Sequence, residues 1–475
     1  MVKPTKITNG HRPIAPLLRL LPLLPSCSHL PSGSSSRRAT TGRRTRAGIS
    51  QLHPIVLLPG ASCSNYEVRL TEPYRPSVPR CGAMKEKGWF RLWDNASDLL
   101  AHDYIDCFME QISLVYDPVT EDYRNLPGVE MWLLNFGSAT GFHVEKSFLQ
   151  LIPSSIKFIL TIMTLLTLKF SQSFRRLLCL SALRHALERI GYRNGVTLFG
   201  APYDFRHAPP VPGQTTSEVF SAYFEQLARL VEEASKNNEH KKREPCFGHS
   251  FGGMVALEFV RSTPLAWRNR YIKHLILVAP TLSEGFMESV KYLISGTDMF
   301  HIPTTTPLGM RPMWRSFESA IVNLPSPAVF GHGPLVITKL RNYSAHDMED
   351  LLAAIGFVEG IEPFRKRGLP RRQHFQAPMV PVTCINGVGN RTPRQLVYWE
   401  SDFDAAPELV NGDGDGTINL VSMLAFDAKM RRQPGQKKKF KSIKLHGALH
   451  SKIVADEWAL TRVMQEIHEA NLVSS

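Results

Sequence analysis

Several short apolar runs occur along the chain, and a segment with helical periodicity lies between the first two of them. Runs rich in Val, Ile and Leu occupy residues 53–60 (HPIVLLPG), 271–280 (YIKHLILVAP) and 379–389 (MVPVTCINGVG), and each closes on Pro or Gly. Such runs predict buried strands that end at tight turns. Residues 217–236 instead repeat apolar side chains at the spacing of an amphipathic helix. The apolar positions of that repeat are Phe220, Phe224, Leu227, Leu230 and Val231. Strands separated by helices favour an α/β fold with a parallel sheet covered by helices on both faces.

Two stretches interrupt this alternation. Residues 282–378 are Pro-rich and irregular between predicted strands, which indicates an inserted cap. Residues 148–180 are strongly apolar, but their uninterrupted core at 158–168 has 11 residues between two lysines, whereas a membrane-spanning helix needs about 20. An interfacial helix, a buried helix and an insertion at about 144–179 that is foreign to the ancestral fold all remain open as interpretations.

Most of the positive charge lies at the start of the chain. The formal net charge is +14, and residues 1–50 hold nine Lys or Arg with no acidic residue. The remainder, 51–475, therefore carries +5 and is only mildly basic. Basic clusters at 364–372 and 429–444 are typical of solvated faces, or of a face that meets an anionic membrane. No basic motif interleaved with aromatic residues appears, so a nucleic-acid partner is disfavoured.

Residues 1–50 form a polar leader that we expect to be disordered and to resemble a signal or transit peptide. The stretch 13–26 (PIAPLLRLLPLLPS) resembles the hydrophobic region of a secretory signal, although an Arg and several prolines interrupt it. The Ser- and Arg-rich tract that follows is also typical of an organellar transit peptide. Sequons at Asn95, Asn342 and Asn390 favour the secretory pathway, whether extracellular, endoplasmic reticulum or vacuole. Seven scattered cysteines show no zinc spacing and allow one or two disulfides.

A serine flanked by glycines is the first candidate for chemistry. Residues 248–252 read G-H-S-F-G and follow the short run EPCF, and the helix-like stretch MVALEFVRS comes directly after them. This order is typical of a nucleophile elbow, in which a strand turns sharply into a helix and exposes the serine oxygen. The flanking glycines are required because side chains there would collide with neighbouring backbone. The pattern favours Ser250 as a nucleophile.

A nucleophilic serine needs a base and an orienting carboxylate, and both candidates lie downstream. The Gly-rich loop at 411–420 (NGDGDGTINL) contains Asp413 and Asp415, and the loop after the strand-like KSIKL contains His446 and His450. The order Ser, Asp, His is that of α/β-hydrolases. A calcium loop would need a later Glu that is missing here, so we expect no metal and no cofactor.

Taken in order, these stretches resemble the lecithin:cholesterol acyltransferase-like family, and its plant members in particular. The matching stretches span most of residues 52–470. They are HPIVLLPG with NYEVRL, GWFRLW, YDP with DYRNLPGV, FGAPYDFR, GHSFGG, PLAWRNRYIKHLILVAP, NYSAHDMEDLLAAIGF, VPVTCINGVG, NGDGDGTINL and HGALHSKIV. Related families are lysosomal phospholipases and phospholipid:diacylglycerol acyltransferases. The resemblance implies an α/β-hydrolase domain with a cap and an interfacial lid at about 62–143.

The resemblance also gives roles to single residues. It makes Ser250 the nucleophile, Asp415 rather than Asp413 the orienting acid, and His450 the base, with His446 in a structural role. The resemblance also implies that the backbone amides of two residues form the oxyanion hole. These are Phe251 and Ala61.

The resemblance places a disulfide between Cys81 and Cys107, closing a membrane-facing lid that contains Trp89 and Trp93. A Trp on an exposed loop enters a lipid interface readily, and simple packing is the alternative role. The chain departs from the family pattern in the loop PGASCSN after the first strand, and in the run before the elbow, which supplies few aliphatic residues.

The sequence thus predicts a serine-dependent lipid O-acyltransferase. An acyl chain would pass from a glycerophospholipid through acyl-Ser250 to a sterol or other lipid alcohol. Water as the acceptor would make the protein a phospholipase A. A catalytically impaired membrane- or lipid-binding homologue is the alternative from another class. The expected partners are a phospholipid membrane or lipid particle and the lipid alcohol.

Overall fold

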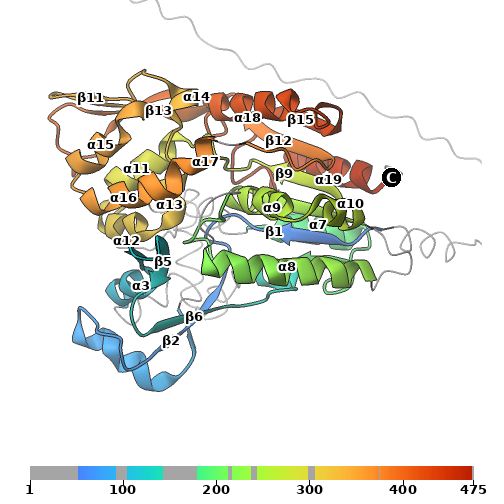
Figure 1. Ribbon diagram of the computed structural model, residues 1–475, viewed down its shortest axis with the longest axis horizontal. Helices are drawn as coiled ribbons and strands as arrows, with labels where there is room; N and C mark the ends of the chain where they lie inside the picture. The colour runs from blue at the N-terminus through green and yellow to red at the C-terminus, as the bar shows by residue number, and fades with distance from the viewer. Residues whose placement is uncertain are drawn as a thin grey trace, which may run out of the picture. The chain divides into compact units, whose positions relative to one another are not determined.

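Six parallel strands form the central sheet of the computed structural model, in the order β15-β12-β9-β8-β1-β7 (Figure 1). Their bounds are Ile55–Leu58 (β1), Leu198–Gly200 (β7), Glu244–His249 (β8), Ile272–Val278 (β9), Val382–Val388 (β12) and Phe440–His446 (β15). The predicted strands at 53–60, 271–280 and 379–389 are confirmed as β1, β9 and β12. The structure describes residues 52–92, 104–142, 179–211, 217–236, 243–297, 305–373 and 375–472.

Helices cover both faces of this sheet. They are α7 (Ser181–Arg189), α8 (Glu218–Lys236), α9 (Phe251–Ser262), α10 (Leu265–Tyr271), α18 (Leu420–Arg432) and α19 (Glu457–Leu472). Alternate side chains of β1 point to opposite faces: Ile55 and Leu57 share a core with α7 and α19, whereas Val56 and Leu58 share one with α8 and α9. The fold is therefore the predicted α/β-hydrolase architecture, and residues 217–236 supply its expected amphipathic helix.

Short helices and a four-stranded sheet form a second layer, and in the chain its elements lie between β9 and β15 of the central sheet. Its helices are α11 (Met287–Ser295), α12 (Arg311–Ser316), α13 (Glu318–Val322), α14 (Pro327–Phe330), α15 (Met348–Ala354), α16 (Ile361–Pro363) and α17 (Pro370–Gln373). The sheet order is β11-β10-β13-β14. Strands β10 (Val336–Thr338) and β11 (Asn342–Tyr343) come from the expected cap segment, and β13 (Asn390–Tyr398) and β14 (Glu408–Gly414) come from beyond it (Figure 1). We call this layer the cap.

Antiparallel strands and a helix make up the described part of the expected lid. Strands β2 (Tyr66–Leu70), β3 (Phe90–Arg91) and β6 (Val129–Leu133) form one sheet, and a hairpin pairs β4 (Leu114–Asp117) with β5 (Asp122–Asn125). The 3-10 helix η1 (Pro79–Lys87) and α3 (Ile105–Ile112) complete it. The expected leader at 1–50 and most of the insertion at 144–179 lie outside the described residues. None of the described helices is both long and apolar enough to cross a membrane.

Candidate active site

Ser250 stands at a sharp turn between β8 and α9. Its backbone adopts φ 54° and ψ −126°, a strained combination for a residue with a side chain. The neighbouring glycines make this turn possible, because a Cβ at Gly248 would lie 2.4 Å from the Gly252 carbonyl oxygen, and a Cβ at Gly252 would lie 2.2 Å from the Pro59 carbonyl oxygen. The local pattern G-x-S-x-G is thus explained by backbone approach at both glycines.

The strand before the elbow is well paired despite its few aliphatic residues. β8 runs for six residues and hydrogen-bonds to β1 on one side and β9 on the other. Its register shifts between Glu244 and Pro245, where proline lacks the N–H of a regular ladder. Cys246 and Phe247 are buried on opposite faces of the sheet. Two neighbouring strands therefore fix the position from which Ser250 departs.

Three side chains from distant parts of the chain form a continuous hydrogen-bonded row. His450 Nε2 lies 2.8 Å from Ser250 Oγ, and His450 Nδ1 lies 2.9 Å from Asp415 Oδ2. Asp415 is fully buried, and its Oδ1 accepts hydrogen bonds from the amides of Thr417 (3.0 Å) and Ile418 (2.7 Å). The His450 amide also donates to the Asp415 carbonyl oxygen at 2.8 Å. These contacts place a carboxylate, an imidazole and a serine hydroxyl in one hydrogen-bonded row, an arrangement that suits nucleophilic chemistry.

The two alternative candidates lie outside this row. Asp413 is exposed at the end of β14, and its Oδ1 accepts from the Gly389 amide at 2.6 Å. His446 ends β15, where its ring packs so close to Gly389 that a Cβ on this glycine would lie 2.3 Å from it. Neither side chain has a described contact with Ser250.

His249 is a residue of the site that the sequence did not single out. Its Nε2 donates to the carbonyl oxygen of His450 over 3.2 Å, and the two imidazole rings lie 5.7 Å apart. Burial, and then the neighbouring charge of His450, lowers the pKa of His249 to about 3. His249 is therefore neutral near neutral pH and acts as a fixed donor to the loop that carries His450. The sequence places His249 next to Ser250 but does not indicate its contact with the His450 carbonyl oxygen.

The loop after β1 passes directly beside the serine. A Cβ at Gly60 would lie 3.2 Å from Ser250 Cβ, so a side chain at this position would crowd the serine. Ala61 follows Gly60, and the Phe251 amide is the first N–H of α9, a position without an intrahelical acceptor. The loop folds back with a hydrogen bond of 3.3 Å from the Cys63 amide to the Gly60 carbonyl oxygen.

A disulfide that the sequence did not predict fastens this loop. Cys63 is joined to Cys179, across a separation of 116 residues. Two hydrogen bonds also hold this loop. The Tyr203 hydroxyl donates to the Pro59 carbonyl oxygen at 2.8 Å, and Ser64 Oγ donates to the Tyr203 carbonyl oxygen at 2.7 Å. Seven scattered cysteines offered no spacing from which this pairing could be read.

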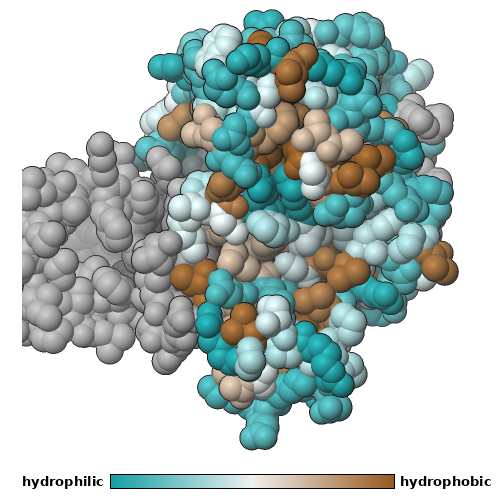
Figure 2. All heavy atoms as spheres, turned by 90° about the vertical axis from the view of Figure 1, so that its left-hand side faces the viewer, coloured by the Kyte–Doolittle hydropathy of each residue, from teal (hydrophilic) through white to brown (hydrophobic). Residues whose placement is uncertain are grey.

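Of the four residues predicted for the lid, Cys81, Trp89 and Cys107 lie in the described part of the chain. A disulfide joins Cys81 in η1 to Cys107 in α3. Trp89 is 42% exposed, with the Arg69 guanidinium 5.1 Å from its ring centroid. Trp93 lies outside the described residues. The face that presents the cap and the lid carries hydrophobic residues scattered among hydrophilic ones (Figure 2).

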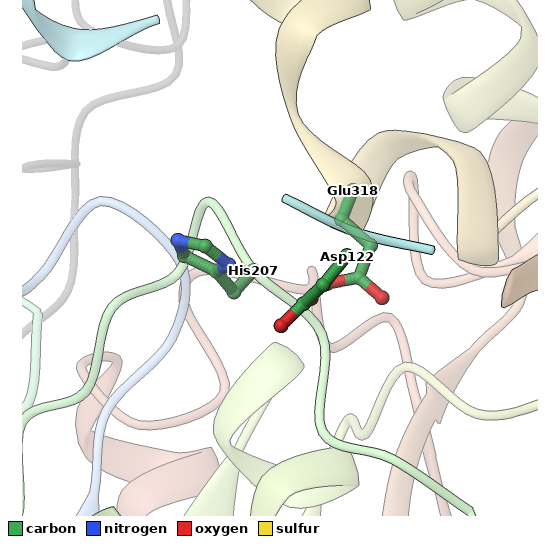
Figure 3. A group of neighbouring side chains, drawn as sticks. All are labelled: Asp122, His207 and Glu318. Atoms are coloured by element: carbon green, nitrogen blue, oxygen red, sulfur yellow. The ribbon is translucent and has the colours of Figure 1, made fainter. Parts of the chain in front are cut away.

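One cluster has the composition of a metal site. Ligand atoms of Asp122, His207 and Glu318 lie within 4.8 Å of one another (Figure 3). However, Glu318 Oε1 accepts from Arg367 Nε at 2.7 Å, and its Oε2 accepts from the Ala208 amide at 2.8 Å. Burial lowers the pKa of Arg367, and attraction to Glu318 outweighs this effect and raises the pKa above its ordinary value. The guanidinium therefore already supplies the cation, and we interpret the cluster as a buried ion-pair network.

The fold and the arrangement around Ser250 define an α/β-hydrolase. Within that class the chain belongs to the lecithin:cholesterol acyltransferase family, whose model matches residues 89–350. Family membership agrees with the resemblance read from the motifs and makes this a lipid acyltransferase or phospholipase type of enzyme.

Curated relatives span most of the chain. Lecithin-cholesterol acyltransferase-like 1 of Oryza sativa subsp. japonica is 39% identical over 90% of this chain and 89% of its own. Lysosomal phospholipase A and acyltransferase of Canis lupus familiaris is 30% identical over 81% and 84%, respectively. Phosphatidylcholine-sterol acyltransferase of Mus musculus is 26% identical over 77% and 74%. Among solved structures, MenH from S. aureus has a TM-score of 0.28 at 13% identity over 62% of this chain and 90% of that one.

Proposed function

We propose that this chain transfers an acyl group from a glycerophospholipid through an acyl-Ser250 intermediate to a lipid alcohol. The observation that supports this most is the row Ser250–His450–Asp415, with distances of 2.8 and 2.9 Å. A serine in an elbow with a base and a buried orienting acid is equipped for acyl transfer.

In the first half-reaction His450 Nε2 takes the proton of Ser250 Oγ as the oxygen attacks the ester carbonyl carbon. The carbonyl oxygen becomes an oxyanion, which the amides of Phe251 and Ala61 stabilise as hydrogen-bond donors. The ester C–O bond then breaks. His450 gives its proton to the departing lysophospholipid oxygen, and the acyl group stays on Ser250.

The second half-reaction reverses these roles. An acceptor hydroxyl gives its proton to His450 and attacks the acyl-serine, and collapse of the second oxyanion returns the proton to Ser250 Oγ. Asp415 orients the imidazole through Nδ1–H and stabilises the imidazolium in both halves. Its carboxylate is held by the Thr417 and Ile418 amides, so it does not turn away as the charge on His450 changes.

The acceptor distinguishes the two enzymatic alternatives. A sterol or another lipid alcohol makes the protein an O-acyltransferase, and water makes it a phospholipase A. The names of the relatives support both, since one is a phosphatidylcholine-sterol acyltransferase and another a phospholipase A and acyltransferase. An impaired lipid-binding homologue is less well supported, because the serine and the base are already within hydrogen-bonding distance.

We further propose that the lid meets a phospholipid surface, with Trp89 at the interface. Two disulfides on the described residues support folding in an oxidising compartment, and hence the secretory pathway. The exposed part of Trp89 offers an apolar ring together with an N–H that remains in contact with water.

The test is product analysis on phosphatidylcholine vesicles that contain cholesterol. Wild type and Ser250→Ala would be compared for sterol ester and free fatty acid, and a fluorophosphonate probe would report the reactivity of Ser250 directly. Sterol ester that disappears in the variant supports acyl transfer, and free fatty acid alone supports the phospholipase. No labelling and no product from wild type would exclude both and leave the lipid-binding homologue.

A further inference from the structure

A cluster of charged side chains lies at α9, α17, α18 and the segment before α11, and two of its members lie over the ring of Phe375. We call it the arginine ring, and its members are Arg261, Arg371, Arg372, Lys429, Glu258 and Glu284. Arg261 lies over the Phe375 ring at 5.4 Å, and Lys429 Nζ lies 5.9 Å from the same centroid. Lys429 pairs with Glu284 at 2.8 Å, and Glu284 in turn attracts Arg372. On the α9 side, Arg261 pairs with Glu258 at 2.7 Å, and Arg371 interacts with both of these residues.

The two arginines of α17 have no carboxylate of their own. Arg371 donates from Nη1 to the Pro209 carbonyl oxygen and from Nη2 to Met254 Sδ at 3.3 Å. Arg372 donates from Nη2 to the Leu324 carbonyl oxygen at 2.5 Å, and its guanidinium lies over the Phe364 ring. These acceptors are neutral groups, so neither guanidinium forms a direct ion pair, although Glu258 and Glu318 attract Arg371 and Glu284 attracts Arg372 from farther away.

Several guanidinium nitrogens of the ring are buried without an acceptor among the described residues. They are Nε and Nη2 of Arg261, Nε of Arg371, and Nε and Nη1 of Arg372. Arg261 and Arg371 are 7% and 3% exposed, and Arg372 is partly buried, so these nitrogens have little contact with bulk solvent. A buried donor on a charged group costs considerable free energy when it is unpaired, and such groups in native proteins commonly contact an ion or water.

The ring has more positive than negative charge. It holds four cations and two carboxylates, which leaves two positive charges in excess. Burial lowers the pKa of Arg371 to about 10, and burial followed by repulsion from Arg371 lowers the pKa of Arg372 to about 9. Arg367, in the same basic run, behaves oppositely because it pairs with Glu318 at 2.7 Å. Within this basic run, Arg371 and Arg372 thus differ from Arg367 in lacking a direct ion pair.

We propose that the arginine ring binds a doubly charged oxyanion, namely inorganic phosphate or a phosphate monoester. A dianion matches the two excess positive charges, and its oxygens supply the acceptors that the guanidinium groups lack. A phosphodiester headgroup has a single negative charge at phosphorus and fits less well. The proposed acyl transfer does not enter this inference, and binding is independent of whether Ser250 is reactive.

The test is thermal unfolding of the full chain in phosphate and in chloride at equal ionic strength. We expect inorganic phosphate to raise the Tm by a few degrees in a saturable way, because a ligand of the native state stabilises it by mass action. Glycerol 3-phosphate should act similarly and glycerophosphocholine should not, which separates a phosphate monoester from a lipid headgroup. Protein freed of small ions and then denatured should also release phosphate when it was purified in phosphate buffer.

The variant Arg371→Leu/Arg372→Leu removes the two arginines without a direct ion pair and should lose the phosphate response. Its matched control is Arg365→Gln/Lys366→Gln, which removes two exposed cations from the same run and should keep the response. If the double variant does not fold, Arg372→Leu alone should raise the phosphate concentration for half-maximal effect at least tenfold. An absent phosphate effect in wild type, or an equal effect in all variants, overturns the proposal.

Discussion

His249 Nε2 lies 3.2 Å from the carbonyl oxygen of His450, so the residue before Ser250 holds the loop that carries His450. The contact joins the end of β8 to the loop after β15, two segments separated by 201 positions. His249 is neutral and buried, and its hydrogen bond is therefore insensitive to pH over the range in which the enzyme would work. We interpret it as a positioning residue that keeps His450 Nε2 against Ser250 Oγ.

Replacing His249 with phenylalanine should lower the turnover number about tenfold, because a small displacement of His450 lengthens the proton transfer from Ser250. His249→Gln, which keeps a donor, should restore part of the loss. His446→Gln, in the same loop region but outside the row, is the control and should stay near wild type. The measurement is the rate of fluorophosphonate labelling together with kcat and KM on phosphatidylcholine vesicles. Equal rates for the Phe variant and wild type would remove His249 from the mechanism.

The two aspartates of the Gly-rich loop should differ sharply when each is changed to asparagine. Asp415→Asn should reduce kcat by roughly 10³- to 10⁴-fold, because the amide no longer holds the correct imidazole tautomer. Asp413→Asn should have a much smaller effect, since Asp413 is exposed and contacts the Gly389 amide. Both substitutions are isosteric, so the comparison of kcat/KM isolates the charge. A larger loss in the Asp413 variant would contradict the assigned orienting acid.

The two disulfides should affect different substrates. Cys63→Ser/Cys179→Ser loosens the loop that contains Ala61 and should slow turnover of a soluble ester and of vesicles alike. Cys81→Ser/Cys107→Ser loosens the lid and should mainly slow the reaction on vesicles. The measurement compares a water-soluble p-nitrophenyl ester with phosphatidylcholine vesicles for both variants, after circular dichroism has shown that each is folded. A parallel loss on both substrates for the lid variant would argue against an interfacial role.

Glu244 should make stability fall as pH rises. It is buried at the start of β8, neither of its oxygens has a hydrogen-bond partner in the described part of the chain, and burial raises its pKa from 4.5 to about 9. The folded chain therefore keeps a proton that the unfolded chain releases, so stability present below pH 4.5 is lost progressively up to pH 9. The loss at pH 7 is roughly 3 kcal/mol at 1.36 kcal/mol per pKa unit. Urea unfolding between pH 5 and 8 checks this.

Glu244→Gln removes the ionisable group and should flatten this dependence. Glu225→Gln, at an exposed position of α8, is the control and should leave the slope of wild type unchanged. An unchanged slope in the Glu244 variant would mean that this carboxyl is not buried in the folded protein.

Local patterns along the sequence determined the elements of this protein and the family to which it belongs. The apolar runs became β1, β9 and β12 because such side chains are buried on both faces of a parallel sheet. The spacing within 217–236 became α8, and the local pattern G-x-S-x-G around Ser250 indicated the elbow. Each of these features depends on neighbours in sequence, and a single chain displays it directly.

Tertiary structure alone decided which distant side chains meet. The choice of Asp415 over Asp413 rests on a contact with His450, 35 residues away, and the family resemblance had only suggested it. No sequence signal indicated the Cys63–Cys179 disulfide or the bond from His249 to His450, and the sequence showed the basic clusters at 364–372 and 429–444 without showing that they meet in the arginine ring. Their partners are brought together by packing of the sheet, the cap and the helices, and packing depends on the whole chain at once.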